Sequence, residues 1–225
     1  AGLRDVVIDA QKALLDGALA AEVPRFIPSD YSLDFTKFQD GENRNLDLRW
    51  EFHKILDRTP IKATTIFNGA FTELITNEMP LILYKQKLVL YWGEADHKLC
   101  FTTMDDTAAF TAKAALDDNA PRYLRIAGDL ISAREVKKVV MEVTGEKFRM
   151  FRPGGLRFLS LMIKIVRKLA GGENELYPPW QGMQYMRNMI DDRSNMLKLD
   201  NDRYPGIGWT TVKDVLVEHN SKSIV

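Results

Sequence analysis

The spacing of apolar residues along the chain alternates between two periods, and this alternation predicts a layered α/β protein. Residues 3–22 carry apolar side chains at helical spacing, with Asp, Lys and Gln between them. A short apolar run follows at 23–28, helical spacing returns over 45–57, and a β-branched run occupies 61–67. This order and spacing are typical of consecutive βαβ units with a parallel sheet. Because both runs are nearly free of polar residues, we expect helices on both faces of the sheet.

The middle of the chain departs from this rhythm. Two extended runs at 88–91 and 99–102 flank Gly93, which predicts a hairpin inserted near 81–103. Ser132 and Glu135 have the spacing of a capping box, which opens a helix that runs to about residue 144. The other predicted elements are helices over 105–116, 156–170 and 180–190, extended segments over 123–126 and 148–151, and a final helix from about 211.

The charge balance argues against a nucleic-acid partner. The 225 residues contain 31 Lys and Arg and 31 Asp and Glu, so the formal net charge is zero. A nucleic-acid-binding protein usually has a basic excess or a basic stripe. The three histidines, His53, His97 and His219, are far apart and lack the spacing of zinc ligands, so no metal site is predicted.

Cysteine usage and hydropathy indicate the compartment. Cys100 is the single cysteine, so no disulfide can form within one chain, which favours a reducing environment. It lies in an apolar run, and we interpret it as a small buried hydrophobic residue. Apolar runs stay well short of a membrane span, and the first residues lack the pattern of a signal peptide. We therefore expect a cytoplasmic protein with no membrane partner.

Four segments, in this order along the chain, resemble the NmrA-like and isoflavone-reductase-like branch of the atypical short-chain dehydrogenases/reductases. Residues 23–31 look like that family's strand ending in a Pro-Ser-Glu-Phe-type loop. Residues 61–71 resemble its next strand, which ends here in Phe-Asn-Gly-Ala-Phe. Residues 101–108 resemble a strand followed by an Asp-capped helix, and residues 201–206 match a motif near the end. Each motif is weakly specific, and their order and spacing carry the resemblance.

The resemblance implies a fold and a division of the chain. The fold is a Rossmann-like doubly wound parallel sheet, incomplete on its N-terminal side, with a small C-terminal α+β lobe. Residues 1–130 are then the remainder of an NAD(P)-binding domain that includes the hairpin insertion. Residues 131–225 form a smaller substrate-type lobe interleaved with it. The implied cofactor is NADP or NAD.

One part of the family pattern is missing. Family members begin with a G-x-x-G-x-x-G turn that holds the cofactor pyrophosphate at a helix N-terminus, and this sequence has no such motif. By resemblance the chain starts at the family's fourth helix, so two βαβ units of roughly 60 or more residues in all would precede it. Either the sequence is a fragment or the protein lacks that half.

The acid/base pair of the family is also changed. Short-chain reductases place a Tyr and a Lys one helical turn apart, on the same face of a helix. Aligning the helix that leads into residue 61 puts Arg49 at the Lys position and Asn45 at the Tyr position. Arg can hydrogen-bond a ribose but hardly ever loses its proton. Arg49 is either a cofactor contact or a surface partner of Asp47 or Glu51, and His53 and Lys54, one turn further on, are candidate substitutes.

Candidate site residues lie where the predicted strands end, because an open α/β sheet binds its ligand there. By resemblance the cofactor-binding residues are Pro28, Ser29, Asp30, Arg49, Phe67, Asn68 and Gly69. Turn chemistry and strand termination explain the same residue types without a ligand. The resemblance assigns catalysis to Arg49 and to Tyr31, whose hydroxyl is a candidate proton donor. Phe71, Trp180 and Met183 are the candidate substrate contacts, although Trp180 and Met183 also fit helical core packing.

Three functions remain open. The first is an NAD(P)H-dependent reductase of a small apolar or aromatic carbonyl or enone compound. The second is an NAD(P)-binding regulator that signals to a protein partner, and the third is a scaffold without the cofactor half. Basic residues between 148 and 169 either attract an anionic partner or membrane surface or form the solvated face of a helix. These residues are Arg149, Arg152, Arg157, Lys164, Arg167 and Lys168. The oligomeric state is left open.

Overall fold

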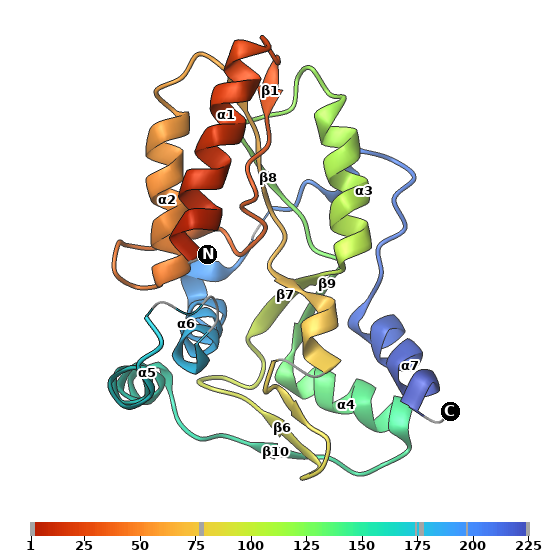
Figure 1. The fold of residues 1–225 in the computed structure, drawn as a ribbon. Helices are drawn as coiled ribbons and strands as arrows, with labels where there is room; N and C mark the ends of the chain where they lie inside the picture. The colour runs from red at the N-terminus through yellow and green to blue at the C-terminus, as the bar shows by residue number, and fades with distance from the viewer. Residues whose placement is uncertain (1–2, 77–78, 174, 176–177, 197, 224–225) are drawn as a thin grey trace.

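The computed structural model describes residues 3–76, 79–173, 175, 178–196 and 198–223. Its centre is a set of parallel strands with helices on both sides (Figure 1). β1 (Arg25–Phe26) pairs in parallel with β2 (Lys62–Ala63), and β3 (Thr65–Phe67) pairs in parallel with β8 (Tyr123–Arg125). All three residues of β3 are buried, as expected of a strand covered on both faces.

The helices that connect these strands make the crossovers expected of a parallel sheet. α2 (Arg44–Leu56) lies between β1 and β2 along the chain, and α3 (Met104–Ala115) lies between β3 and β8. α1 (Gln11–Ala20) continues from a π-helical turn, η1 (Asp5–Ala10), and packs beside α2. In Figure 1, α1 and α2 lie on one side of the strands and α3 on the other. The predicted α/β class is confirmed.

A second sheet has the order β4–β7–β9 and carries the chain into its C-terminal half. β4 (Ala70–Phe71) is parallel to β7 (Lys98–Thr102), and β7 is antiparallel to β9 (Asp129–Ser132). Directly after β9, α4 (Ala133–Thr144) begins at the predicted capping box, in which the Ser132 and Glu135 side chains bond each other's backbone N–H groups.

The third sheet corrects the predicted hairpin. Its order is β10–β6–β5, from β10 (Arg149–Phe151), β6 (Leu88–Leu90) and β5 (Ile82–Leu83). The run at 88–91 therefore pairs with β5 and β10, and the run at 99–102 pairs with β4 and β9, so pairing these two runs with each other was wrong. After β6 the backbone continues beside 151–154, where Tyr91 N–H donates to the Phe151 carbonyl and Gly93 N–H to the Gly154 carbonyl. Residues 91–93 thus continue alongside the chain that follows β10 instead of turning back onto β6.

The remaining helices surround the lower part of the molecule as drawn in Figure 1. They are α5 (Leu156–Ala170), α6 (Pro179–Met189) and α7 (Val212–Ser223). Four short turns complete the described elements: η2 (Phe35–Lys37), η3 (Thr72–Thr76), η4 (Asp192–Ser194) and η5 (Asn201–Arg203). Among the described helices, none has both the length and the apolar character needed to cross a bilayer.

One hydrophobic core joins the two halves of the sequence. It includes fully buried Phe35, Phe67 and Phe101 together with Val136 of α4 and Val212 of α7. Both predicted domains contribute side chains to this core, so they pack directly against each other. The division at residue 130 stays a prediction.

The segment 200–212, which we call the C-terminal strap, is attached to the sheet by side chains. Asp200 accepts a hydrogen bond from Arg125 N–H at 2.8 Å, and Asn201 both accepts from and donates to the backbone of Ala127. Two further carboxylates accept backbone N–H groups of the strap: Asp106 from Thr210 and Asp129 from Val212. One backbone bond, from Asp200 N–H to the Arg125 carbonyl at 2.7 Å, adds to these contacts, so side chains make most of the attachment but not all of it.

Candidate functional site

The ends of two neighbouring strand segments lie side by side. The Ser32 carbonyl accepts hydrogen bonds from Asn68 N–H at 3.0 Å and from Gly69 N–H at 3.2 Å. This contact brings the loop at 28–32 next to the end of β3, as the parallel topology requires. A binding role for the residues of these two segments remains a prediction.

In the loop at 28–32, Ser29 is exposed and the other residues are buried or half-buried. Ser29 is exposed and its backbone N–H donates to Gln11 of α1, whereas Pro28 is buried. Tyr31 is half-buried and packs against the cluster that contains Ile66 and Phe110. Asp30 is completely buried and is the centre of a polar network.

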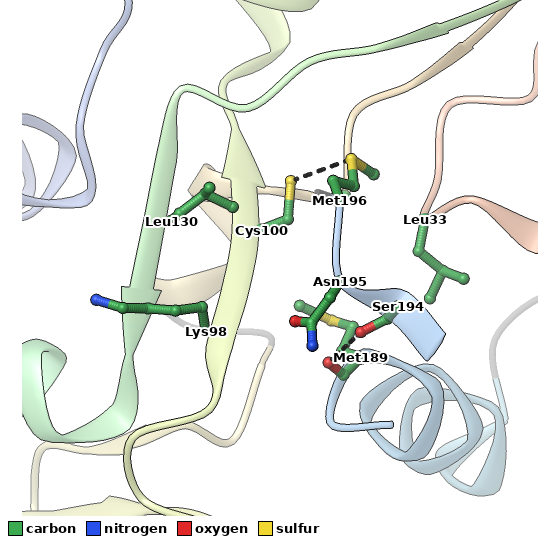
Figure 2. A pocket seen from close by; sticks show the side chains of 9 residues that line it. Leu33, Lys98, Cys100, Leu130, Met189, Ser194, Asn195 and Met196 are labelled. Atoms are coloured by element: carbon green, nitrogen blue, oxygen red, sulfur yellow. Dashed lines mark hydrogen bonds between the residues drawn. The ribbon is translucent and has the colours of Figure 1, made fainter. Parts of the chain in front are cut away.

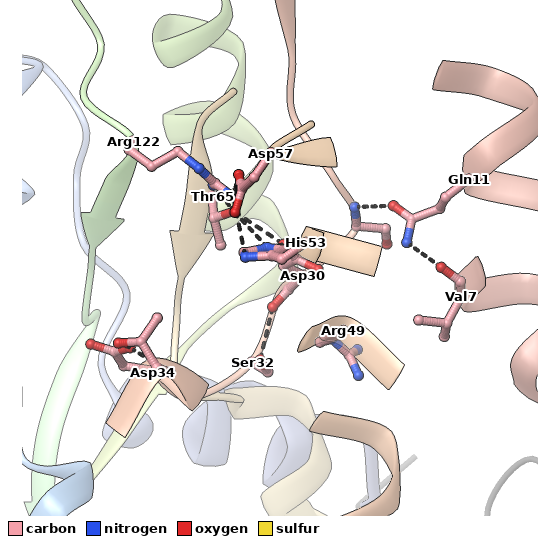
Figure 3. A network of polar contacts seen from close by, with 12 residues as sticks. Val7, Gln11, Asp30, Ser32, Asp34, Arg49, His53, Asp57, Thr65 and Arg122 are labelled. Atoms are coloured by element: carbon pink, nitrogen blue, oxygen red, sulfur yellow. Dashed lines mark hydrogen bonds and ion pairs between the residues drawn. The ribbon is translucent and has the colours of Figure 1, made fainter. Parts of the chain in front are cut away.

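This network joins the loop to α2 and to both central strands (Figure 3). Asp30 Oδ2 lies 2.5 Å from His53 Nε2 and accepts the Thr65 hydroxyl at 3.1 Å. Arg122 donates to Thr65 Oγ1 at 2.8 Å, and its other terminal nitrogen lies 3.1 Å from His53 Nδ1 and 3.0 Å from Asp57 Oδ1. Asp30 and His53 have no exposed side-chain surface, so solvent does not screen their contact.

The partners of His53 define its tautomer. A guanidinium can only donate, so Nδ1 facing Arg122 must accept. The proton of the ring is then on Nε2 and is donated to Asp30 Oδ2. The ring is also packed among Phe35, Trp50 and Tyr123. His53, one of the sequence candidates on α2, is therefore held as a buried hydrogen-bonding residue under the strand ends.

Arg49 lies one turn before His53 on the same helix. Its Nη1 donates to the Asn45 carbonyl and to the Tyr185 hydroxyl, while Nε is buried and has no hydrogen-bond partner. Glu51 pairs with Arg4 instead, so the surface ion pair considered for Arg49 is not observed with it. The unpartnered Nε is a donor available to a ligand atom.

Asn68 and Gly69 occupy the end of the strand segment for different reasons. The Asn68 amide donates to Thr107 at 3.3 Å, and its Oδ1 is buried without a partner. Gly69 has a φ of +71°, and a Cβ at this position would lie 2.3 Å from the Cys100 carbonyl oxygen. Glycine is required here because β7 passes so close, which is sufficient reason without a ligand.

A pocket of about 190 Å³ opens directly beside Gly69 (Figure 2). Its lining is mostly apolar and comes from four places: the loop after β1, the connection from β3 to β4, strands β7 and β9, and the end of α6 with the chain after it. The lining residues are Leu33, Gly69, Lys98, Cys100, Leu130, Met189, Ser194, Asn195 and Met196. Its volume is below the roughly 300–1,000 Å³ of most ligand sites, but its mostly apolar lining with a few polar groups has the character of one.

Sulfur atoms dominate one wall of this pocket. Cys100 Sγ lies 3.9 Å from Met196 Sδ, and the two side chains face each other in Figure 2. Burial raises the pKa of the Cys100 thiol to about 12, so it stays protonated at neutral pH. Lys98 is paired with Glu135 and points out of the pocket. The wall is therefore an uncharged, polarizable surface.

Comparison with known proteins identifies the family. The model of the NmrA-like family matches residues 3–166.

The chain belongs to the NmrA-like family.

Among the curated relatives of this NmrA-like chain is the bifunctional pinoresinol-lariciresinol reductase of Linum perenne. It is 26% identical over 208 residues, which cover 88% of this chain and 65% of the relative. An NmrA-like family domain-containing oxidoreductase of Gibberella moniliformis is 26% identical over 144 residues, covering 60% and 46%. The chain thus spans about half to two thirds of the length of the curated relatives it matches.

Solved structures share the fold of the NmrA-like chain. The ternary complex of leucoanthocyanidin reductase from Vitis vinifera has a TM-score of 0.78 at 15% identity, covering 98% of this chain and 76% of that one. An isoflavone reductase structure has a TM-score of 0.71 at 16% identity, covering 89% and 67%. These matches confirm the predicted Rossmann-like fold and the resemblance to isoflavone reductases.

The fit to a nicotinamide dinucleotide is partial. The buried Arg49 Nε and Asp30 Oδ1 have no protein partner, which leaves one donor and one acceptor near the strand ends for the nicotinamide side of a cofactor. The pyrophosphate, by contrast, has no glycine-rich turn in this sequence. Within the described residues, no group of three or more His, Cys, Asp or Glu side chains is arranged to hold a metal ion.

The three predicted substrate contacts lie away from the pocket in the NmrA-like chain. Phe71 is half-buried in β4, and Met183 packs with Leu159 and Ile163 of α5. Trp180 is completely buried: its indole N–H donates to the Gly171 carbonyl at 2.7 Å, and the guanidinium groups of Arg44 and Arg167 lie over its ring. The spacing of Trp180 and Met183 suits helix packing equally well, and these contacts favour that interpretation.

Sequence analysis missed most of the pocket lining and half of the polar network. Met196, Asn195 and Leu33 lie in irregular segments that no periodic pattern marks. Thr65 begins β3 and Arg122 directly precedes β8, and the two residues meet because these strands, far apart in sequence, pair in parallel. The available signal was His53 itself, an ionisable residue flanked on its helix by apolar Phe52 and Leu56, which are also buried.

Proposed function

We propose that this NmrA-like chain carries the substrate side of an NAD(P)H-dependent reductase that acts on a small apolar or aromatic carbonyl or enone compound. The observation that carries the proposal is the apolar pocket beside Gly69, at the edge where parallel strands end. The proposal is also supported by the NmrA-like family membership. The curated relatives are named as reductases and an oxidoreductase, which agrees with it. The relatives share only part of their length with the chain, so their substrates are not carried over.

A bound dinucleotide supplies the hydride, and the protein supplies position and a dry environment. Met196, Met189 and Leu33 exclude water from the reacting face of the substrate. Asn195, the amide in the lining, orients a substrate oxygen by hydrogen bonding. Arg49 would contact the ribose through its unpartnered Nε, and Tyr31, on the loop that meets the end of β3, would be the proton donor.

The alternative within the family is an NAD(P)-sensing regulator without catalysis. One observation favours it: Asn45 and Arg49 stand where the resemblance expects Tyr and Lys, and a guanidinium stays protonated at neutral pH and so does not act as an acid or base. A scaffold without cofactor binding is the third possibility, since these 225 residues contain no glycine-rich turn of that kind.

Calorimetric titration with NADPH and NADH separates these functions. The titration is made on the 225-residue chain and on any longer protein that the same gene encodes with additional N-terminal residues. Binding followed by turnover in a screen of aromatic carbonyl and enone compounds supports the reductase. Binding without turnover supports the regulator, and absence of binding to either protein refutes both.

A pair of variants tests the assigned residues once binding is measured. Arg49→Met removes the buried donor, and we expect weaker dinucleotide binding because the ribose contact is lost. Lys138→Met, which removes an exposed cation on α4, is the matched control. Met196→Trp fills the pocket, and we expect it to raise KM for the substrate while dinucleotide affinity stays unchanged.

A further inference from the structure

Basic residues are concentrated in one stretch of an otherwise balanced chain. Residues 147–172 contain seven Lys and Arg and no Asp or Glu. The rest of the chain therefore has 24 basic and 31 acidic residues. This stretch comprises β10, the loop after it and α5, and it creates a local positive field that attracts anionic partners.

Most of these cations have no partner in the protein. Arg167 is paired with Glu173. Within the described residues, the side chains of the other cations on β10, in the loop and on α5 form no hydrogen bond or ion pair, and these are Arg149, Arg152, Arg157, Lys164 and Lys168. Many arginines elsewhere in the chain are bonded, Arg122, Arg125 and Arg193 among them. The charge of this surface is therefore not used to stabilise the fold.

The same surface exposes large apolar side chains. α5 packs on α6 through Leu159 and Ile163, which are buried. Its outward face carries an apolar row at positions i, i+3, i+7 and i+11, with exposed fractions that reach 52% at Leu161 and 81% at Leu169, and this row consists of Phe158, Leu161, Ile165 and Leu169. Phe151 of β10 is also half-exposed. In the part of the chain that the structure describes, five of the twelve exposed large apolar residues thus belong to this one stretch.

The two rows run side by side along the helix. Arg157, Lys164 and Lys168 directly precede Phe158, Ile165 and Leu169 of the apolar row. Successive residues of an α-helix are about 100° apart around its axis, so the cations form a second row beside the apolar one. The helix is about 22 Å long at 1.5 Å per residue and lies at the outer edge of the molecule (Figure 1). We define the amphipathic surface as Phe158, Leu161, Ile165 and Leu169 with Arg157, Lys164 and Lys168.

We propose that this amphipathic surface docks the protein onto an anionic lipid bilayer. An outward-facing helix with an apolar row beside a cationic row lies flat at such a boundary. Its Leu, Ile and Phe side chains then enter the hydrocarbon edge, and the longer basic side chains reach the phosphate layer. A second copy of the chain fits less well, because α5 against α5 brings like-charged rows together. A nucleic acid would leave the apolar row exposed to water. The inference is independent of the reductase proposal.

Vesicle sedimentation tests this inference with the full chain. We expect the protein to sediment with phosphatidylcholine vesicles that contain roughly a third phosphatidylserine, and not with phosphatidylcholine alone. Binding should weaken steeply as salt is raised from about 0.05 to 0.5 M, because surface charges are then screened. Binding that is equal for neutral and anionic vesicles, or absent for both, overturns the proposal.

Matched variants assign the binding to α5. Lys164→Glu with Lys168→Glu should weaken vesicle binding at least roughly twenty-fold, at about five-fold for each lost cation. The control, Lys54→Glu with Lys138→Glu, makes the same charge change on two other helices and should leave binding within about two-fold. Leu161→Ser with Ile165→Ser should abolish binding, whereas Leu116→Ser with Val217→Ser should not.

Two further readouts keep the result interpretable. Circular dichroism and thermal unfolding of each variant establish that it is folded, as expected for substitutions at exposed positions. Light scattering measures the oligomeric state without vesicles. If the α5 variants lose only self-association, the surface joins two copies of the chain and the lipid proposal is wrong.

Discussion

Replacing His53 by Phe isolates the buried contact beneath the strand ends. The change keeps an aromatic ring among Phe35, Trp50 and Tyr123 but removes both ring nitrogens. Asp30 then loses the hydrogen bond at 2.5 Å, and its Oδ1 already has no partner. Only the Thr65 hydroxyl remains on that carboxyl group. The substitution therefore leaves a buried acid poorly satisfied, at nearly unchanged packing.

The expected loss follows from the complete burial of both partners. Removing one member of a buried, hydrogen-bonded pair costs about 3–5 kcal/mol, because the other member stays in a poorly solvated position. For a chain of 225 residues, about 2–4 °C in Tm corresponds to each kcal/mol. We therefore expect His53→Phe to lower the Tm by about 6–20 °C.

Asp57→Asn is the internal control, because it alters the exposed end of the same network. Asp57 accepts from Arg122 at 3.0 Å, and its side chain is half exposed, so we expect a loss of no more than about 1 kcal/mol. Urea unfolding followed by circular dichroism measures both variants. If His53→Phe lies within about 1 kcal/mol of the unmodified protein, the contact does not stabilise the fold and the reasoning fails.

Three other predictions concern backbone strain, thiol reactivity and pH. Gly69→Ala should lower the free energy of unfolding by at least about 2 kcal/mol, because the new Cβ would both sit on a left-handed backbone and clash with the Cys100 carbonyl. Gly41→Ala has the left-handed backbone (φ +86°) but open space around the Cβ, so it should cost only about 1 kcal/mol. Equal unfolding midpoints for the two variants would contradict this. Because burial raises the pKa of Cys100 to about 12, iodoacetamide near pH 8 should modify the folded protein at least roughly a hundred-fold more slowly than the unfolded chain, as measured by mass spectrometry; similar rates would show that the pocket wall is open and the thiol ionised. Burial raises the pKa of Asp47 from 3.8 to about 6, so the folded protein retains a proton that the unfolded chain has lost between these values, and stability falls as pH rises through that window. Asp47→Asn should remove this part of the pH dependence in urea titrations, and an unchanged profile would exclude Asp47 as its source.

Local signals in the sequence predicted the elements that depend on local chemistry. The helix after Ser132 begins where its capping box indicates and ends at Gly145, which has a φ of +69°. The sequence also placed residues 29–31 and 68–70 at the ends of parallel strands, and the structure shows the backbone contact with residues 68 and 69 at Ser32, just after the first of these segments. The binding and catalytic roles of these residues stay predictions.

Features that depend on distant partners were not predictable in the same way. The run at 88–91 has the composition of a hairpin strand, but composition does not choose its partner, and β10 lies about sixty residues further along. Trp180 carries the same uncertainty: an aromatic residue at helical spacing suits a pocket or a core, and only the positions of Gly171, Arg44 and Arg167 decide between them. The pocket combines short pieces of chain around residues 33, 69, 100 and 196, and no window of sequence contains them together.

The C-terminal strap has a consequence for how this fold tolerates change. Its attachment to the sheet uses the side chains of Asp106, Asp129, Asp200 and Asn201. Backbone hydrogen bonds between strands survive most substitutions, since every residue except proline has the same N–H and C=O groups. Each of these side-chain hydrogen bonds, by contrast, is lost when a single residue is replaced. The strap leads directly into α7, which packs on α4. Single substitutions can thus weaken the attachment of the strap and of α7 while the central strands stay paired. Connecting segments of this kind vary more than the elements they join and often carry binding residues, so we expect sequence differences within the family to concentrate here.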